Sequence, residues 1–86
     1  MANSLRILFF ASLRDSVGAA EVHVDEPVPV TLESLWPVLR QRLGPEAVRA
    51  LQEENVRIAI NQELAVAPIR FGAGDEVAFL PPVTGG

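Results

Sequence analysis

The sequence of 86 residues contains no cysteine and no lysine, and each absence excludes a class of chemistry. Without cysteine, the chain has no disulfide, no thiolate nucleophile and no cysteine-ligated zinc, which agrees with a cytosolic protein. The seven basic residues are all arginines. Because lysine amines are the acceptors in lysine-linked protein polymers, this chain can be attached to something else but cannot readily form such polymers of itself.

Positive charge is also scarce. The net charge is −4 and the isoelectric point is near 4.8, so the chain lacks the basic surface that nucleic-acid binding needs. No apolar run approaches the roughly 20 residues of a membrane span, and residues 1–6 lack the layout of a signal peptide. We therefore expect a cytoplasmic protein that binds neither nucleic acid nor membrane. The length and the 49% hydrophobic content predict one small domain with one core.

Groups that commonly carry catalysis are few. The only histidine, His23, lies between Val22 and Val24 in an alternating stretch, so we expect it on a solvent-exposed strand face. No serine or threonine has a base at a recognisable spacing. The adjacent acids Asp75 and Glu76 would point to opposite faces of a strand, so they make a poor acid–base pair. The sequence predicts no metal site and no catalytic machinery within the domain.

Alternation and turn residues predict five strands, and apolar periodicity predicts two helices. The strands are residues 5–11, 21–24, 56–60, 63–66 and 76–80. The main helix follows a cap at Thr31 and ends at Gly44-Pro45, and a short helix covers residues 46–54. Residues 12–18 are predicted to be a connection with at most one helical turn.

The main helix contains one internal conflict. Its apolar stripe consists of Trp36 and of leucines at positions 32, 35, 39 and 43. Pro37 lies beyond the first turn, where a proline costs about 3 kcal/mol. The helix therefore either begins later, near Leu35, or is bent at Pro37.

The order of elements predicts an α+β domain with a helix packed on one face of a mixed sheet. If the first and last strands, the most apolar ones, lie side by side at the centre, the fold is a β-grasp, the ubiquitin-like arrangement. Leu8 and Phe10 would then share the other face with Leu80, with Leu64 nearby. Such an exposed apolar patch favours docking of a partner, unless the short helix and loops close over it.

The chain ends in Pro81-Pro82-Val83-Thr84-Gly85-Gly86. We divide it into a domain of residues 1–80 and an extended tail of residues 81–86. The two prolines prevent further strand pairing and keep the chain extended. The two glycines have no Cβ atom, so they can pass through a narrow tunnel. The tail suits delivery of its terminal carboxylate into another protein's active site; the alternative is a frayed end without a role.

Three segments resemble the small subunit of molybdopterin synthase. They are Leu8-Phe9-Phe10-Ala11-Ser12-Leu13-Arg14, then Ile60-Asn61-Gln62, and finally Gly74-Asp75-Glu76-Val77-Ala78-Phe79-Leu80-Pro81-Pro82-Val83-Thr84-Gly85-Gly86. The likeness spans the domain in order and in length. The final block is highly specific, whereas the middle helices are generic.

The resemblance implies a sulfur carrier. In such proteins the terminal glycine, here Gly86, is adenylated with ATP by a ubiquitin-activating-like adenylyltransferase and converted to a thiocarboxylate. The tail then enters the large synthase subunit and donates sulfur to a cyclic pyranopterin monophosphate, forming molybdopterin. The resemblance also implies a heterotetramer, a catalytic lysine on the large subunit and no cofactor bound permanently by this chain. It places Phe10, Arg14, Leu64 and Leu80 at partner contacts.

Three other interpretations stay open. The first is a sulfur carrier of another pathway, such as thiamine thiazole synthesis, although those carriers look shorter and lack this combination of segments. The second is a protein modifier attached to target lysines through Gly86. The third is a plain interaction domain with an inert tail.

Overall fold

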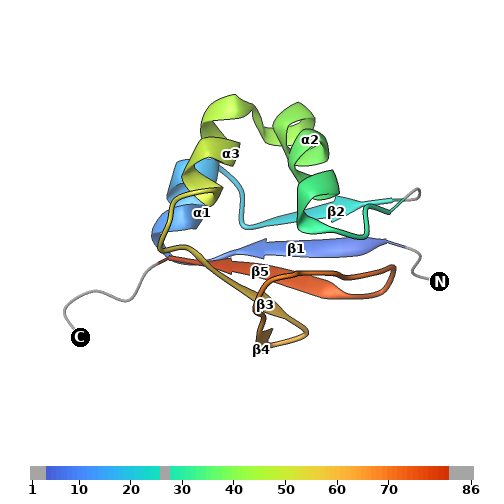
Figure 1. Cartoon of the computed structure of the whole chain (residues 1–86). Coiled ribbons are helices and arrows are strands. Elements are labelled where there is room, and N and C mark those ends of the chain that lie inside the picture. The colour runs from blue at the N-terminus through green and yellow to red at the C-terminus, as the bar shows by residue number, and fades with distance from the viewer. Residues whose placement is uncertain (1–3, 26–27, 82–86) are drawn as a thin grey trace.

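A computed structural model describes residues 4–25 and 28–81, which form one mixed sheet with helices on one side (Figure 1). The strands are β1 (Leu5–Phe9), β2 (Glu21–Val24), β3 (Arg57–Ile60), β4 (Glu63–Leu64) and β5 (Glu76–Leu80). The helices are α1 (Ser12–Val17), α2 (Leu32–Leu43) and α3 (Pro45–Leu51). Residues 82–86 of the predicted tail lie outside the described residues.

The last strand lies at the centre of the sheet, whose order is β2-β1-β5-β3-β4. β1 runs parallel to β5, with Ile7 opposite Val77 and Phe9 opposite Phe79. β2 and β3 pair antiparallel with the outer sides of these two strands. The first and last strands are therefore neighbours, and the predicted β-grasp fold is confirmed. Because they are parallel, both end at the same edge of the sheet, where α1 also lies (Figure 1).

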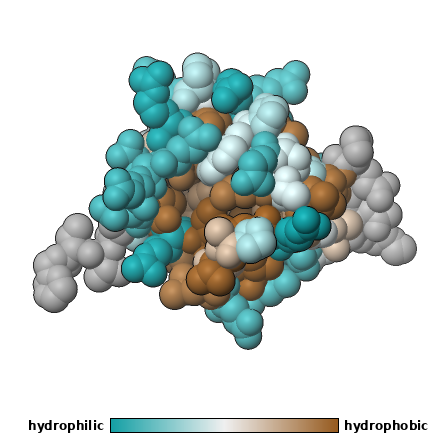
Figure 2. Space-filling model, viewed as in Figure 1, coloured by the Kyte–Doolittle hydropathy of each residue, from teal (hydrophilic) through white to brown (hydrophobic). Residues whose placement is uncertain are grey.

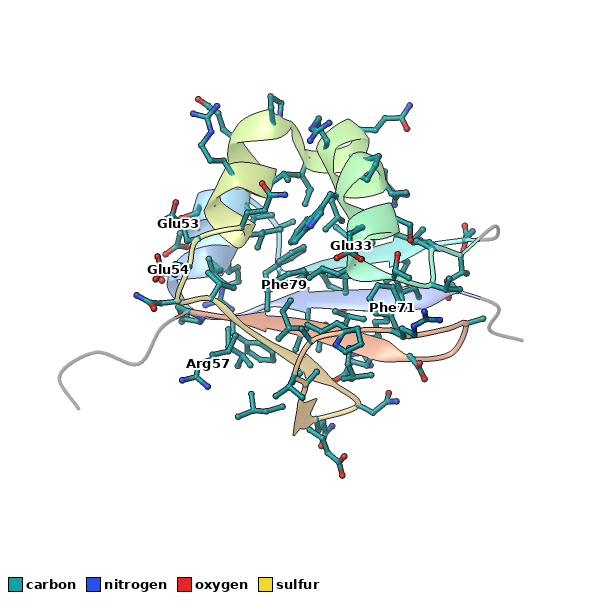
Figure 3. All side chains as sticks on the ribbon, in the orientation of Figure 1. Glu33, Glu53, Glu54, Arg57, Phe71 and Phe79 are labelled. Carbon is teal, nitrogen blue, oxygen red and sulfur yellow. The ribbon has the colours of Figure 1, made fainter. Side chains whose placement is uncertain are left out.

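The core fills the space between the sheet and the helices. Alternate residues of the central strands point into it: Ile7 and Phe9 of β1, and Val77 and Phe79 of β5, are almost completely buried. The ring of Phe79 stacks on Phe9 and also contacts Trp36 of α2, with 5.8 Å between ring centroids in each pair (Figure 3). These contacts fix α2 across the two central strands.

Thr31 caps α2, as the sequence predicts. Its Oγ1 accepts a hydrogen bond from the N–H of Ser34, and Oγ of Ser34 accepts one from the N–H of Thr31, both at 3.1 Å. The helix begins at Leu32 and continues through Pro37, so the interpretation of a later start is wrong. Because proline has no N–H, the carbonyl of Glu33 lacks its usual helical donor. The ring of Pro37 is exposed and disturbs no core packing.

The connection predicted for residues 12–18 is instead α1, a helix of six residues. Leu13 and Val17 bury its inner face. Gly18 ends it in the left-handed conformation, with φ of 84°, and donates its N–H to the carbonyl of Arg14 at 2.9 Å. A pattern of only two apolar residues four positions apart cannot distinguish a helix from a loop. For this reason the sequence predicted only a connection with at most one helical turn.

Other boundaries differ by a few residues. β1 ends at Phe9 rather than Ala11, β3 begins at Arg57, and β4 contains only Glu63 and Leu64. α3 spans Pro45–Leu51 and is shorter than predicted. β2 and β5 have the predicted bounds. In the part of the chain that the structure describes, every helix is too short or too polar to span a membrane.

Candidate functional site

The sheet has one face that the helices leave uncovered, which we call the open face (Figure 1). The alternation of β1 and β5 places Leu8, Phe10, Ala78 and Leu80 on this face, because their neighbours in sequence point into the core. Figure 2 shows apolar atoms gathered over β3 and β4, whereas the surface over the helices is largely hydrophilic. The alternative in which the short helix closes over this face is wrong, because α3 packs on the opposite side.

Two adjoining hollows lie on the open face where β1 and β5 end. The first, which we call the tail-root hollow, has a volume of about 460 Å³ and is lined by Phe10, Ala11, Arg57, Leu64, Leu80 and Pro81. The second, of about 250 Å³, shares three of these residues and adds Ala59, Gln62, Glu76 and Ala78. Phe10 remains 43% exposed and Leu64 65% exposed. The structure thus brings three predicted partner-binding residues, Phe10, Leu64 and Leu80, into one exposed apolar patch.

Arg14, the fourth predicted partner-binding residue, lies apart from this patch. It is exposed on α1 and lines neither hollow. However, α1 begins two residues after Phe10 and lies at the edge of the sheet where β5 ends (Figure 1). Arg14 therefore borders the same end of the molecule, and its contact with a partner stays a prediction.

A tight turn fixes Phe10 relative to α1. Ala11 has φ of 51° and ψ of −127°, a region that glycine occupies freely and that strains other residues. The N–H of Leu13 donates to the carbonyl of Phe10 at 3.0 Å, the hydrogen bond that closes a β-turn. The N–H of Phe10 in turn donates to the carbonyl of Phe79 at 3.1 Å. The exposed ring of Phe10 is therefore carried by a backbone that is tied to both β5 and α1.

Arg57 also belongs to this site, although no motif in the sequence marks it. β3 pairs with β5 so that Arg57 lies opposite Leu80 and Ala59 lies opposite Ala78. This register turns Arg57 toward the open face. The alternation of the predicted strand already puts Arg57 and Ala59 on one face. The pairing with β5, which brings that face to the tail root, is a tertiary contact without a local sequence signal.

A charged row occupies another part of the open face. Nε of Arg6 lies 3.1 Å from Oε2 of Glu21, and Nη1 of Arg6 lies 3.5 Å from Oε1 of Glu76. Nε2 of His23 contacts the same oxygen of Glu21, and His23 is exposed, as predicted. The hydrogen bond with His23 lowers the pKa of Glu21 below its ordinary value of 4.5; desolvation opposes this shift and Arg6 adds to it. Such exposed pairs contribute little to stability.

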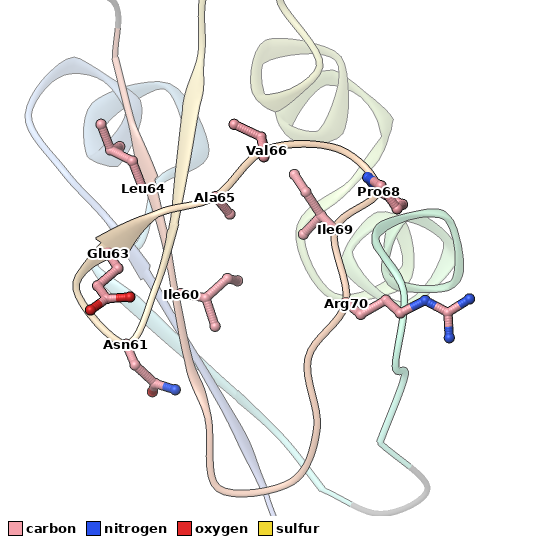
Figure 4. Close-up of a pocket in the computed structure, with 9 residues that line it drawn as sticks. All are labelled: Ile60, Asn61, Glu63, Leu64, Ala65, Val66, Pro68, Ile69 and Arg70. Carbon is pink, nitrogen blue, oxygen red and sulfur yellow. The ribbon is translucent and has the colours of Figure 1, made fainter.

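A third hollow, of about 510 Å³, lies beside β4 (Figure 4). Its two charged residues, Glu63 and Arg70, lie at opposite ends, and the guanidinium of Arg70 points away from it (Figure 4). They therefore form no acid–base pair. Among residues 4–25 and 28–81, histidine, aspartate and glutamate side chains form no group of three that could hold a metal.

The chain matches a known family from β1 to the C-terminal glycines. The ThiS family matches residues 7–86, a span that includes the open face and the predicted tail. The chain belongs to the ThiS family. This ThiS-family chain is 41% identical to the molybdopterin synthase sulfur carrier subunit of Escherichia coli (strain K12), over 95% of its own length and 99% of that protein. It is 37% identical, with the same coverage, to the subunit of that name from Haemophilus influenzae.

The ThiS-family chain also resembles a solved structure. The crystal structure of the small archaeal modifier protein 1 from H. volcanii aligns with a TM-score of 0.67 at 26% sequence identity. The alignment covers 93% of this chain and 98% of the archaeal protein. This likeness supports the β-grasp assignment over the whole domain.

Proposed function

We propose that this chain is the sulfur carrier subunit of molybdopterin synthase and that Gly86 carries the sulfur. The observation behind the proposal is the position of the tail root. β5 ends at Leu80, inside the apolar patch that also contains Phe10 and Leu64. A partner protein that covers this patch therefore has Pro81, from which the tail continues, at its own surface. The 41% identity to a molybdopterin synthase sulfur carrier subunit supports the same function.

The large subunit of molybdopterin synthase is the partner that we assign to the open face. Phe10, Leu64 and Leu80 supply the apolar area that the core of a protein interface needs. Arg14 supplies a positive charge at the end of the sheet where the tail leaves. In this assignment the chain is not catalytic on its own, and the catalytic lysine belongs to the large subunit.

Sulfur loading takes place at Gly86 in two steps. A carboxylate oxygen of Gly86 attacks the α-phosphorus of ATP, pyrophosphate leaves, and a mixed anhydride with AMP forms on the adenylyltransferase. A sulfur nucleophile at the oxidation level of sulfide then attacks the acyl carbon, and AMP departs to leave a thiocarboxylate. Glycine has no side chain to hinder this attack. ATP is held by the activating enzyme, and the carrier binds no cofactor permanently.

Sulfur donation restores the starting state of Gly86. In the active site of the large subunit, the terminal sulfur attacks a side-chain carbon of the cyclic pyranopterin monophosphate, and the bond from that carbon to its oxygen substituent breaks, so that the oxygen leaves. The tail is then joined to the pterin carbon through its acyl-bound sulfur. Water then cleaves the bond between the acyl carbon and sulfur. Sulfur remains on the pterin, and the carboxylate of Gly86 is ready for another cycle.

The intact mass of the protein tests this proposal. After incubation with the activating enzyme, ATP and a sulfide source, we expect a mass increase equal to exchange of one oxygen for one sulfur. Addition of the large subunit and the pterin substrate should return the mass to its starting value. A sulfur-loaded protein that keeps its sulfur in the presence of the large subunit and the pterin would contradict the assignment to molybdopterin synthase.

A second candidate function is attachment to other proteins through Gly86. The similarity to the small archaeal modifier protein 1 of H. volcanii favours it. In the same incubation, with a lysine-containing protein added, this function predicts an adduct in which water is lost between Gly86 and a lysine amine. Adducts without sulfur loading would replace the sulfur-carrier proposal. If neither product forms, the tail is inert under conditions that should activate it.

A further inference from the structure

The described residues that line the tail-root hollow include one charged side chain, whose sign is opposite to the net charge of the chain. The chain carries a net charge of −4. Nevertheless, among the described residues that line this hollow only Arg57 is charged, and the others are apolar. The surface around the tail root is therefore locally positive on an acidic protein, which selects for a partner surface of negative potential.

The pairing of β3 with β5 holds Arg57 at this place. Arg57 lies opposite Leu80, the last residue of β5, and it is exposed to solvent. Figure 3 shows its side chain extending from β3 away from the helices, whereas Glu53 and Glu54 lie on the helix side of the sheet. The acids that are nearest in sequence are therefore separated from Arg57 by the sheet.

Within residues 4–25 and 28–81, no carboxylate forms an ion pair with Arg57. Glu76 lines the adjoining hollow, but it pairs with Arg6 at 3.5 Å. Glu21 is likewise engaged by Arg6 and His23. In the described part of the domain, the charged residues of β1, β2 and β5 on the open face are thus paired with one another. Arg57 makes no ion pair there and is exposed to solvent.

Docking of a partner on the apolar patch would remove water from Arg57. Burying a guanidinium without a counter-charge is costly, so an interface that covers Phe10 and Leu80 needs an acidic group at Arg57. The planar guanidinium fits a carboxylate through two parallel hydrogen bonds, which fixes both position and angle. We propose that Arg57 is a specificity-determining residue of the docking surface and that the large subunit of molybdopterin synthase places a carboxylate against it. The proposal rests on the proposed function.

Charge variants at Arg57 test the proposal. We expect Arg57→Glu to weaken binding to the large subunit by about tenfold or more at low salt, and Arg57→Gln to weaken it less. The loss should shrink as salt rises, because screening reduces the repulsion between like charges. Arg70→Glu makes the same change of net charge on an exposed loop residue outside the tail-root hollow, and it should leave the affinity within about twofold.

Several outcomes would overturn the proposal or the proposed function on which it rests. An unchanged affinity for Arg57→Glu, or equal losses for Arg57→Glu and Arg70→Glu, would overturn the proposal. So would an effect of Arg57→Glu that disappears when the terminal carboxylate of Gly86 is converted to an amide, since Arg57 would then pair with the chain's own terminal carboxylate. Circular dichroism establishes that each variant is folded, and the mass assay at Gly86 reports sulfur loading independently. If the unmodified protein neither loads sulfur nor binds the large subunit, the proposed function itself fails.

Discussion

Ala11 is a non-glycine residue whose backbone departs from ordinary geometry. Its φ of 51° and ψ of −127° lie in a region that disfavours a Cβ atom, and such a conformation costs about 1–3 kcal/mol. The residue is exposed and adjoins Phe10 in the tail-root hollow. The strain is therefore located at the proposed docking surface, where it sets the direction in which the chain passes from β1 into α1.

Glycine at position 11 should relieve this strain. We expect Ala11→Gly to raise the free energy of unfolding by about 1 kcal/mol, since the relief exceeds the added entropy of the unfolded chain. Urea denaturation measures the change. Ala73 provides the control, because it is exposed in a turn at an ordinary φ, and Ala73→Gly should lower stability by about 0.4–1 kcal/mol. If both variants lose stability equally, Ala11 is not strained.

Phe9 and Phe10 are adjacent and face opposite sides of the sheet. Phe9 is 2% exposed in the core, whereas Phe10 is 43% exposed on the open face. We expect Phe10→Asp to weaken binding to the large subunit at least tenfold while it changes folding stability by less than about 1 kcal/mol. Phe9→Asp should unfold the domain, because it places a carboxylate in the core. A collapsed fold in Phe10→Asp, seen by circular dichroism, would show that Phe10 is a core residue.

At the scale of elements, α2 contains an unfavourable residue without a packing role. Pro37 is exposed and deprives Glu33 of a helical hydrogen bond. We expect Pro37→Ala to raise the free energy of unfolding by about 1–2 kcal/mol, since the restored bond outweighs the more flexible unfolded chain. Thermal unfolding measures it. Pro45 occupies the first turn of α3, where proline is well tolerated, so Pro45→Ala should give no gain.

The contact between β1 and β2 should depend on pH through Glu21. Because the folded protein lowers the pKa of Glu21, this carboxylate stabilises the fold above its ordinary pKa of 4.5. That contribution is lost as the pH falls through the lower pKa of the folded state. We expect Glu21→Gln to be less stable than the unmodified protein at neutral pH, with the difference vanishing in acid. A difference that is constant across this range, in urea titrations, would assign the effect to packing.

How well the sequence predicted each element depended on the length of its pattern. The strand of residues 21–24 alternates cleanly and the strand of residues 76–80 is bounded by turn residues, so both have the predicted bounds. α1 has only Leu13 and Val17 as an apolar pattern, too little for a prediction. The backbone of Ala11 and the position of Arg57 beside the tail root arise from tertiary contacts. No local propensity encodes them.

At the scale of the whole molecule, the residues that form the core and the residues proposed to bind a partner lie in separate regions. Helices and core lie on one side of the sheet, the apolar patch lies on the other, and the tail root lies at the end that β1 and β5 share (Figure 1). The last described residue, Pro81, thus lies beside the apolar patch and away from the core. Docking and sulfur transfer should therefore be separable by changes at Gly86.

One residue added after Gly86 should separate them. We expect the extended protein to lose sulfur loading, because its terminal carboxylate no longer belongs to the residue that the activating enzyme must reach. Affinity for the large subunit should change less than about threefold, since the open face is intact. Intact mass and a binding titration give the two measurements. Normal sulfur transfer by the extended protein would remove the proposed role of Gly86.

The central place of β5 also has a mechanical consequence. A pull on Pro81 along the strand is resisted by hydrogen bonds to β1 on one side and to β3 on the other. Both ladders are loaded in shear, so their bonds must break together rather than one after another. A partner protein that pulls on the chain at Pro81 would therefore act on a strand that stays in the sheet while the folded body remains intact.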